Sequence, residues 1–428
     1  MTCEIAVMNK QAVVLAADSA TTVRQWVDGT QEERYFKGAN KIFQLSHSHA
    51  VGLMIYGTAA LHKVPWEILV KDFRDSLGNK AFNSLRAYAD ELFQYAVDHP
   101  HLFPPEYQTR IFIDEVNRVV SIYLFLLAPQ QSEIGKATTR EDRTVAYNDY
   151  FANTLEPLSK NDFPEQIDEE LFNKTFSSNK DELCRRASEA VVTSQIDAAI
   201  EVGPLVELAA NSLAKQYSRF MDETGVVIAG YGDHDYLPRL YHLSCYGMLF
   251  GKILFDEKSS IGIDHDEAMA HIEPFATTSM VETFSLGVSP DIYQSVREEF
   301  KRTLLEYGKA IAQELGGSDE IPNEDALVSD ACNQFMENWG TTALQAHAWP
   351  LNRVISSLPV DEMAELAETL IMLQSLKEKV TKPTESVGGP IDVAVISKTD
   401  GFVWIRRKHY FDPDLNPRFF QRQPQGSK

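Results

Sequence analysis

The sequence predicts an α+β fold in which helices cover sheets whose strands come from both ends of the chain. Three observations predict it. The first sixty residues read as strands, a strand pair is expected at residues 391–406, and long helical patterns occupy much of the chain between them. This order differs from the regular strand–helix alternation of a doubly wound sheet. A layered sandwich with large helical insertions is therefore expected.

The N-terminal segment predicts two pairs of strands. Glu4–Met8 and Ala12–Ala17 are apolar runs separated by a few polar residues, a spacing typical of a β-hairpin. Lys41–Leu45 and Ala50–Tyr56 predict the second pair. The polar stretch Ser19–Asn40 between the pairs is expected to be irregular.

The segment Ala59–Phe220 is expected to be mainly helical. Apolar residues recur at helical spacing over Leu85–Ala96, and Glu182–Tyr217 has a similar pattern. Residues 129–180 are polar and interrupted by prolines. They predict an exposed insertion with short helices.

Strand signals return in the second half of the chain. Gly225–Ala229 and Leu240–Leu243 are apolar runs joined by a turn-rich link. Ile391–Ser397 and Phe402–Arg406 flank the turn residues 399–401 and predict a second clear hairpin.

Two long helical patterns, Asp291–Glu314 and Asp361–Lys379, each open with an aspartate shortly after a proline. Residues 317–358 between them are less regular, and the tail from Asp412 is rich in proline and glutamine. The expected organisation is a sandwich core at residues 1–75, 221–316 and 359–410, a mainly helical insertion at 76–220, a second insertion at 317–358 and a tail at 411–428.

Composition excludes several classes of protein. The 428 residues include 62 acidic and 40 basic side chains, a net charge of −22. This balance opposes sequence-independent binding to nucleic acid or to anionic membranes, which needs a surplus of Lys and Arg. No apolar run approaches the 18 residues of a transmembrane helix, and no secretory signal is evident. Four cysteines without C-x-x-C spacing predict neither a disulfide scaffold nor a zinc site. A cytoplasmic protein is expected.

Thr2 is the first candidate for chemistry. A small residue after the initiator Met normally permits removal of Met1, which leaves a threonine with a free α-amine. Such an amine has a reference pKa near ~7.7–8.0, so at neutral pH it can act as base for its own hydroxyl. This arrangement is a known variant of the nucleophile–base pair.

The predicted hairpin places two charged residues beside Thr2. If the turn centres on Lys10, cross-strand positions sum to about 20, so Thr2 lies opposite Asp18. A carboxylate there can orient the amine or a nearby ammonium. Lys41 opens the next strand, where its charge would lower the pKa of the nucleophile.

Four segments carry a resemblance: Thr2–Val7, Val13–Ser19, Asn40–Phe43 and Gly57–Ala60. Together they resemble the start of a proteasome β subunit or a related N-terminal-nucleophile (Ntn) hydrolase. In that family the aspartate lies sixteen residues after the nucleophile, and a lysine opens the following strand. The resemblance implies a four-layer αββα sandwich, with Thr2, Asp18 and Lys41 as catalytic residues and the Gly57 N–H in the oxyanion hole.

Looser matches bring the similar part of the chain to about half, with the family's central strand pair near residues 225–243 and its last helix-to-hairpin segment near 386–401. Relative to typical members, about seven residues are inserted between Asp18 and Lys41. Two departures concern residues that support the nucleophile. Where the family has an aspartate and a serine, this chain has Thr384 and Val387, with Glu385 and Ser386 close by. Candidates for the family's mid-chain serine are Thr277, Thr278 and Ser279.

The resemblance implies a threonine peptidase that needs no cofactor and no metal and is compatible with a homo-oligomer. Two other interpretations remain open: a small-amide hydrolase or acylase on the same fold, and an inactive scaffold. Cys3 as nucleophile would need Thr2 removed, and its side chain would face away from Thr2's side of the strand. Two histidine-containing clusters resemble metal ligands but are expected to be solvated, namely His47 with His49, and Asp233-His234-Asp235.

Overall fold

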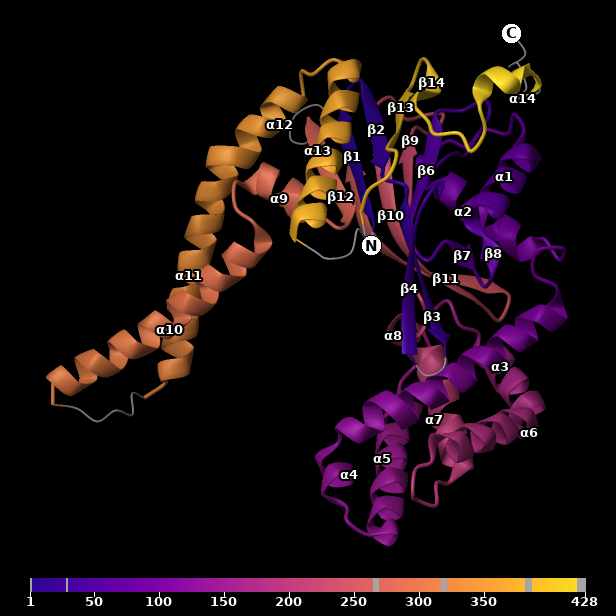
Figure 1. The fold of residues 1–428 in the computed structure, drawn as a ribbon, viewed down its shortest axis with the longest axis vertical. Coiled ribbons are helices and arrows are strands. Elements are labelled where there is room, and N and C mark those ends of the chain that lie inside the picture. Colours follow the sequence, from indigo (N-terminus) through magenta and orange to yellow (C-terminus); the bar gives the residue numbers. More distant parts are fainter. Residues whose placement is uncertain (1, 28–29, 265–268, 317–321, 382–386, 422–428) are drawn as a thin grey trace.

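The computed structural model describes residues 2–27, 30–264, 269–316, 322–381 and 387–421. In this part of the chain, two antiparallel five-stranded sheets form the centre of the molecule (Figure 1). The first sheet has the strand order β12 (Ala270–Ala276), β1 (Cys3–Asn9), β2 (Ala12–Ala17), β13 (Asp392–Ser397), β14 (Gly401–Arg406). The second has the order β11 (Lys252–Gly262), β10 (Arg239–Leu249), β9 (Thr224–Gly230), β6 (Val51–Gly57), β5 (Ile42–Gln44). The mixed α and β fold and both predicted terminal hairpins are confirmed.

The two sheets pack face to face because alternate residues of their strands are apolar on the inner side. In β1, Ala6 and Met8 lie in one buried cluster with Met54 and Val227 of the second sheet. The intervening residues, such as Ile5, lie in another cluster with helix α13 (Val360–Thr381).

Helices α1 (Trp66–Leu77) and α2 (Leu85–Asp98) cover the outer face of the second sheet. Trp66 and Tyr88 are fully buried there, together with Val226 of β9. The two sheets therefore lie between α13 on one side and α1 and α2 on the other (Figure 1).

A helical unit between residues 105 and 220 extends beyond the end of the second sheet (Figure 1). The prediction that residues 129–180 form only short helices is wrong, because the two longest helices of this unit, α5 (Arg140–Lys160) and α6 (Glu169–Ser194), begin in that segment. In α5, only Tyr147, Phe151 and Leu158 are buried, in a cluster shared with α7 (Val202–Lys215), so the apolar stripe is narrow and hard to detect. The elements are α3 (Pro105–Ile122), η1 (Tyr123–Leu127), η2 (Ala128–Gln130), α4 (Ser132–Lys136), α5 (Arg140–Lys160), α6 (Glu169–Ser194), α7 (Val202–Lys215) and α8 (Tyr217–Phe220).

A helical arm projects from the sheets near α13 (Figure 1). The prediction that residues 317–358 are less regular is wrong for the described part, because α11 (Glu324–Ala343) packs along α10 (Pro290–Glu314) through stacked ring pairs such as Phe300 with Phe335. Few of its residues are buried, so the helical period is weak in the sequence. The elements are α9 (Ser279–Leu286), α10 (Pro290–Glu314), α11 (Glu324–Ala343), η3 (Leu344–Ala348) and α12 (Trp349–Ile355).

Residues 19–40 were expected to be irregular, but β3 (Ala20–Val27) pairs with β4 (Thr30–Lys37). The sequence signal for this hairpin is the pair Asp28-Gly29 between segments rich in β-branched and aromatic residues. Strands β11 and β12 also lacked a prediction.

The helix expected near Ala59 begins at Trp66, after the short strands β7 (Ala60–Leu61) and β8 (Val64–Pro65). His62 and Lys63 have positive φ angles of 45° and 72° in the turn between them, which a helix does not tolerate. The tail contains η4 (Pro413–Leu415) and α14 (Pro417–Gln421). None of the helices described is both long and apolar enough to cross a membrane.

Candidate active site

Thr2 lies at the start of β1, in the first sheet. Its carbonyl accepts a hydrogen bond from the Thr277 N–H at 3.0 Å, which fixes the start of the strand against the end of β12. The side chain is buried, and its hydroxyl donates to Asp18 Oδ1 at 2.7 Å. The hairpin register differs from the prediction by one residue, since Glu4 pairs with Ala17 and paired positions sum to 21, but the Thr2 and Asp18 side chains are still in direct contact.

Asp18 follows β2 and is fully engaged. Besides the Thr2 hydroxyl, its carboxylate accepts hydrogen bonds from the N–H groups of Cys3 at 3.1 Å and Gly388 at 2.7 Å. Gly388 has a φ of 143°, which a side chain rarely allows, so a glycine is suited to bring this N–H to the carboxylate. These bonds fix the orientation of the carboxylate beneath the threonine hydroxyl.

Lys41 completes the cluster from the second sheet. It precedes β5, and the Ile55 N–H donates to its carbonyl at 2.9 Å. The ammonium lies 2.5 Å from Asp18 Oδ1 and donates a hydrogen bond to the Thr2 hydroxyl oxygen. The side chains of Lys41 and Asp18 are only 8% and 0% exposed, so this ion pair is only weakly screened by solvent. The structure thus joins a hydroxyl, a carboxylate and an ammonium that the sequence separates by 39 residues.

Gly57 lies with Thr2 and Lys41 in the wall of a cavity of about 130 Å³. It ends β6 with a φ of 79°, and a Cβ atom here would lie 2.6 Å from the Glu223 carbonyl oxygen. A short hairpin follows it instead of the expected helix, so no helix N-terminus points at the cavity from this position. Three of the predicted catalytic residues nevertheless line one cavity, and the fourth, Asp18, contacts two of them, Thr2 and Lys41.

Glu4 is the residue at this site that sequence reasoning missed. It is fully buried, and within the part of the chain described here neither carboxyl oxygen has a hydrogen-bond partner. Burial raises the pKa of Glu4 well above its usual range. Among the neighbouring groups, the Lys41 ammonium lowers the pKa of Glu4, the Asp18 carboxylate raises this pKa, and the Thr2 hydroxyl lowers it. The signal in the sequence is a single acidic residue inside an otherwise apolar strand.

Cys3 faces away from the cavity, as the strand period predicts. Its side chain packs in the buried cluster with Met363 and Ala367 of α13. Burial raises the pKa of its thiol, which opposes formation of the reactive thiolate.

Only some of the expected supporting residues lie in the described part of the chain. Thr384, Glu385 and Ser386 lie outside the described residues, and Val387 is buried in the cluster with α13. Of the mid-chain candidates, Thr277 contacts Thr2 through its backbone, whereas the Ser279 hydroxyl accepts a hydrogen bond from Lys377 at 3.0 Å.

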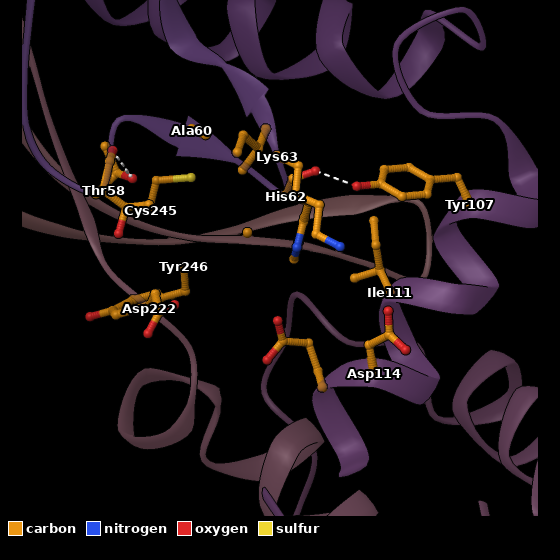
Figure 2. Close-up of a pocket in the computed structure, with 14 residues that line it drawn as sticks. Thr58, Ala60, His62, Lys63, Tyr107, Ile111, Asp114, Asp222, Cys245 and Tyr246 are labelled. Atoms are coloured by element: carbon orange, nitrogen blue, oxygen red, sulfur yellow. Dashed lines mark hydrogen bonds between the residues drawn. The ribbon is translucent and has the colours of Figure 1, made fainter. Parts of the chain in front are cut away.

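Figure 2 shows a larger cavity of about 370 Å³. Thr58 lines both this cavity and the first one. The His62 carbonyl accepts a hydrogen bond from the Tyr107 hydroxyl, and the Met248 N–H donates to His62 Nε2 at 2.7 Å. Burial lowers the pKa of His62 to about 4. Its neutral ring is therefore already bound to the backbone.

The carboxylates around this larger cavity pair with arginines of the helical unit. Glu115 lies 2.8 Å from Arg118, and Asp114 lies 2.7 Å from Arg186. Asp222 also contacts Arg118, at 3.2 Å. These charges are committed to ion pairs at the wall and do not converge on a single reactive atom.

The two clusters that resemble metal ligands in the sequence have structural partners. His47 Nε2 lies 3.1 Å from Asp75, and Asp235 accepts a hydrogen bond from the Gly232 N–H at 2.9 Å. Across the described ranges, no group of three or more His, Cys, Asp or Glu side chains is placed to hold a metal ion.

Comparison with known proteins adds no assignment. No protein-family model matches this chain, and no curated protein sequence matches it significantly. The function is therefore argued from the cluster at Thr2.

Proposed function

We propose that the protein is a threonine-nucleophile amide hydrolase of the Ntn class, with proteasome-like peptidase activity, in which removal of Met1 exposes Thr2. The observation that carries the proposal is the contact of one buried hydroxyl with both members of a buried ion pair, Asp18 and Lys41. A surface threonine with a structural role has no need of an ammonium at its oxygen, whereas a nucleophilic oxygen that develops negative charge is stabilised by one.

In this mechanism the Thr2 hydroxyl oxygen attacks the carbonyl carbon of an amide bond, and the free α-amine accepts the hydroxyl proton, directly or through water. Lys41 stabilises the negative charge on the attacking oxygen, and Asp18 holds Lys41 in place. The Gly57 N–H stabilises the oxyanion of the tetrahedral intermediate. The C–N bond then breaks, the leaving amine takes the proton, and water hydrolyses the ester formed on Thr2.

The packing of the sheets supports the fold that this proposal requires. A helix, two face-to-face antiparallel sheets and two further helices follow one another in space, which is the order of an αββα sandwich. The proposed nucleophile immediately precedes β1 of one sheet, and the lysine immediately precedes β5 of the other.

A small-amide hydrolase or acylase on the same fold is the second candidate. The cavity beside Thr2 has only about 130 Å³, well below the roughly 300–1,000 Å³ of typical ligand pockets. Ile55 and Ala59 contribute apolar walls to it. It therefore suits one small apolar group next to the scissile bond, whether a peptide side chain or a short acyl chain.

The proposal is tested by intact mass spectrometry with an epoxyketone, a probe that reacts with a free N-terminal amine and the adjacent hydroxyl together. We expect loss of Met1, one adduct, and amide hydrolysis. Thr2→Ala is expected to abolish both adduct and turnover while the fold is retained. Cys3→Ala is the matched control, because it alters the neighbouring residue on the other face of the strand and is expected to keep both.

Two results would contradict the proposal. An adduct or undiminished turnover in Thr2→Ala would show that another residue is the nucleophile. Absence of both an adduct and amide hydrolysis in the wild-type protein after Met1 removal would favour the scaffold interpretation. Substrate screening then separates the two candidates, since capped small amides are cleaved by both but unfolded polypeptides only by a peptidase.

A further inference from the structure

We infer that Glu4 is a positioning residue of the Thr2 site, which works as a neutral carboxylic acid and inactivates the nucleophile when it ionises. This inference rests on the proposed function of Thr2. It concerns a residue that takes no part in the mechanism above and that lies behind the nucleophile, outside the cavity that receives the substrate.

The position of Glu4 follows from the strand. Residues two apart on a strand share a face, so Glu4 lies on the same face as Thr2, between the two sheets. Its neighbours across the backbone are Ala17 of β2 and Phe275 of β12. Both neighbours are apolar and buried, and the Glu4 side chain is 0% exposed.

Glu4 differs from Asp18 in what its oxygens contact. Asp18 accepts hydrogen bonds from a hydroxyl, three backbone N–H groups and an ammonium. Glu4 has no hydrogen-bond partner for either oxygen within the described chain. Burying an ionised carboxylate without a partner costs several kcal/mol, so such a group remains protonated instead.

The charged and titratable groups around Glu4 come from several elements. Thr2 and Cys3 precede it on β1, with Asp18 after β2 and Lys41 before β5. Tyr56 of β6 faces it from the second sheet and hydrogen-bonds His242 of β10 at 2.6 Å. Burial, with the charges of Glu223, Glu4 and Glu273, raises the pKa of Tyr56.

Among these groups Lys41 is the nearby cation, and its charge is already balanced by Asp18. Loss of the Glu4 proton to solvent at higher pH would add a second negative charge. That charge would keep the Thr2 α-amine protonated and oppose the negative charge that develops on the hydroxyl oxygen. The neutral acid therefore permits the reaction, and its ionisation opposes it.

The test is Glu4→Gln, which replaces a neutral acid by a neutral group of the same shape. The readout is the rate of epoxyketone adduct formation, and of amide hydrolysis, as a function of pH. We expect the variant to keep the wild-type rate at acidic and neutral pH. We expect its alkaline loss of rate to move upward by about one pH unit or more. Glu273→Gln is the matched control, because it removes a nearby carboxylate that faces Tyr56, and it is expected to leave the profile unchanged.

Two kinetic outcomes overturn the inference: a loss of rate at every pH in Glu4→Gln, which would show that an ionisable carboxyl is needed, or an unchanged pH profile. Failure of Glu4→Gln to fold would also contradict it, because a neutral isostere fits the place of a neutral acid.

Infrared spectroscopy measures the protonation of Glu4 without any turnover. We expect the carbonyl stretch of a protonated carboxyl in the wild-type protein at neutral pH, and its loss in Glu4→Gln. Absence of this band overturns the inference. If the band is present but the processed wild-type protein never reacts with the probe or hydrolyses amides, the proposed function has failed, and the positioning role of Glu4 fails with it although its neutral state stands.

Discussion

The two cavities that meet at Thr58 differ in size and in the use of their charges. The larger one, around His62, has about 370 Å³ and a wall with several titratable side chains, yet its carboxylates pair with arginines of the helical unit. The smaller one, at Thr2, has about 130 Å³, and the buried charges beside it converge on one hydroxyl oxygen. Convergence of charge on a nucleophile, more than volume, distinguishes a candidate for catalysis.

The largest effect expected from this difference concerns two lysines, one in each cavity. Lys41→Met removes the ammonium at the Thr2 oxygen, and we expect adduct formation to slow by about 10²–10³-fold, as for loss of an oxyanion-stabilising donor. Lys63→Met is the control, since Lys63 is exposed in the wall of the larger cavity. Its rate is expected to stay close to wild type in the same mass-spectrometric assay.

Lys41→Met also leaves Asp18 buried without its cation, which costs about 3–5 kcal/mol of stability in comparable pairs. Thermal melts are therefore measured alongside the rates, at a temperature where both variants are folded. Equal losses in the two lysine variants would remove the distinction between the cavities.

The second prediction, of intermediate size, concerns the stability of the folded protein at acidic pH. Its cause is His62 in the wall of the larger cavity. The folded His62 has a pKa of about 4, lowered by burial from its ordinary value of 6.5. Between these values the unfolded chain binds more protons than the folded one, so stability falls as pH decreases from 6.5 to 4. The loss amounts to about 3 kcal/mol. His62→Gln, whose amide oxygen can accept the Met248 N–H, is expected to lose less stability over this range.

Urea unfolding at pH 7 and pH 4.5 measures this difference between wild type and His62→Gln. Adduct formation at neutral pH is expected to be the same in both proteins, because the ring is engaged by the backbone away from Thr2. An identical acid dependence of stability in the two proteins would contradict the buried neutral state of His62.

The sequence predicted the parts of the fold that short-range periodicity determines. The N-terminal hairpin has only a few residues in its turn, so its register was predicted to within one residue. Paired positions sum to 21 rather than 20, as in Glu4 with Ala17, and the Thr2 and Asp18 side chains still make contact. The long helices α5 and α11 were missed because their buried residues form narrow stripes within polar sequence. Tertiary packing in the helical unit, and ring stacking in the arm, determine these helices more than local pattern does.

Glu4 shows the corresponding limit for the site. Both faces of β1 are buried, one against α13 and the other against the second sheet, so the strand reads as a continuous apolar run. The run locates the strand but does not reveal which face carries the cavity. Asp18 and Lys41 were predicted from register and resemblance, whereas the role of Glu4 depends on what the opposite sheet places above it.

The third prediction has the smallest expected effect per pH unit. It uses the free energy of unfolding to test the charge state of Glu4. Because burial raises its pKa above the ordinary value of 4.5, the folded protein binds more protons than the unfolded chain between the two values. Stability must then fall as pH rises through that window, by about 1.4 kcal/mol for each unit. Glu4→Gln lacks this term, so its advantage over wild type is expected to grow with each step in urea unfolding at pH 5, 6 and 7. A constant difference would mean that Glu4 is ionised equally in both states. Both carboxylates beside Thr2 would then be charged, as the carboxylates around His62 are in their ion pairs, and the contrast between the cavities would rest on Lys41 alone.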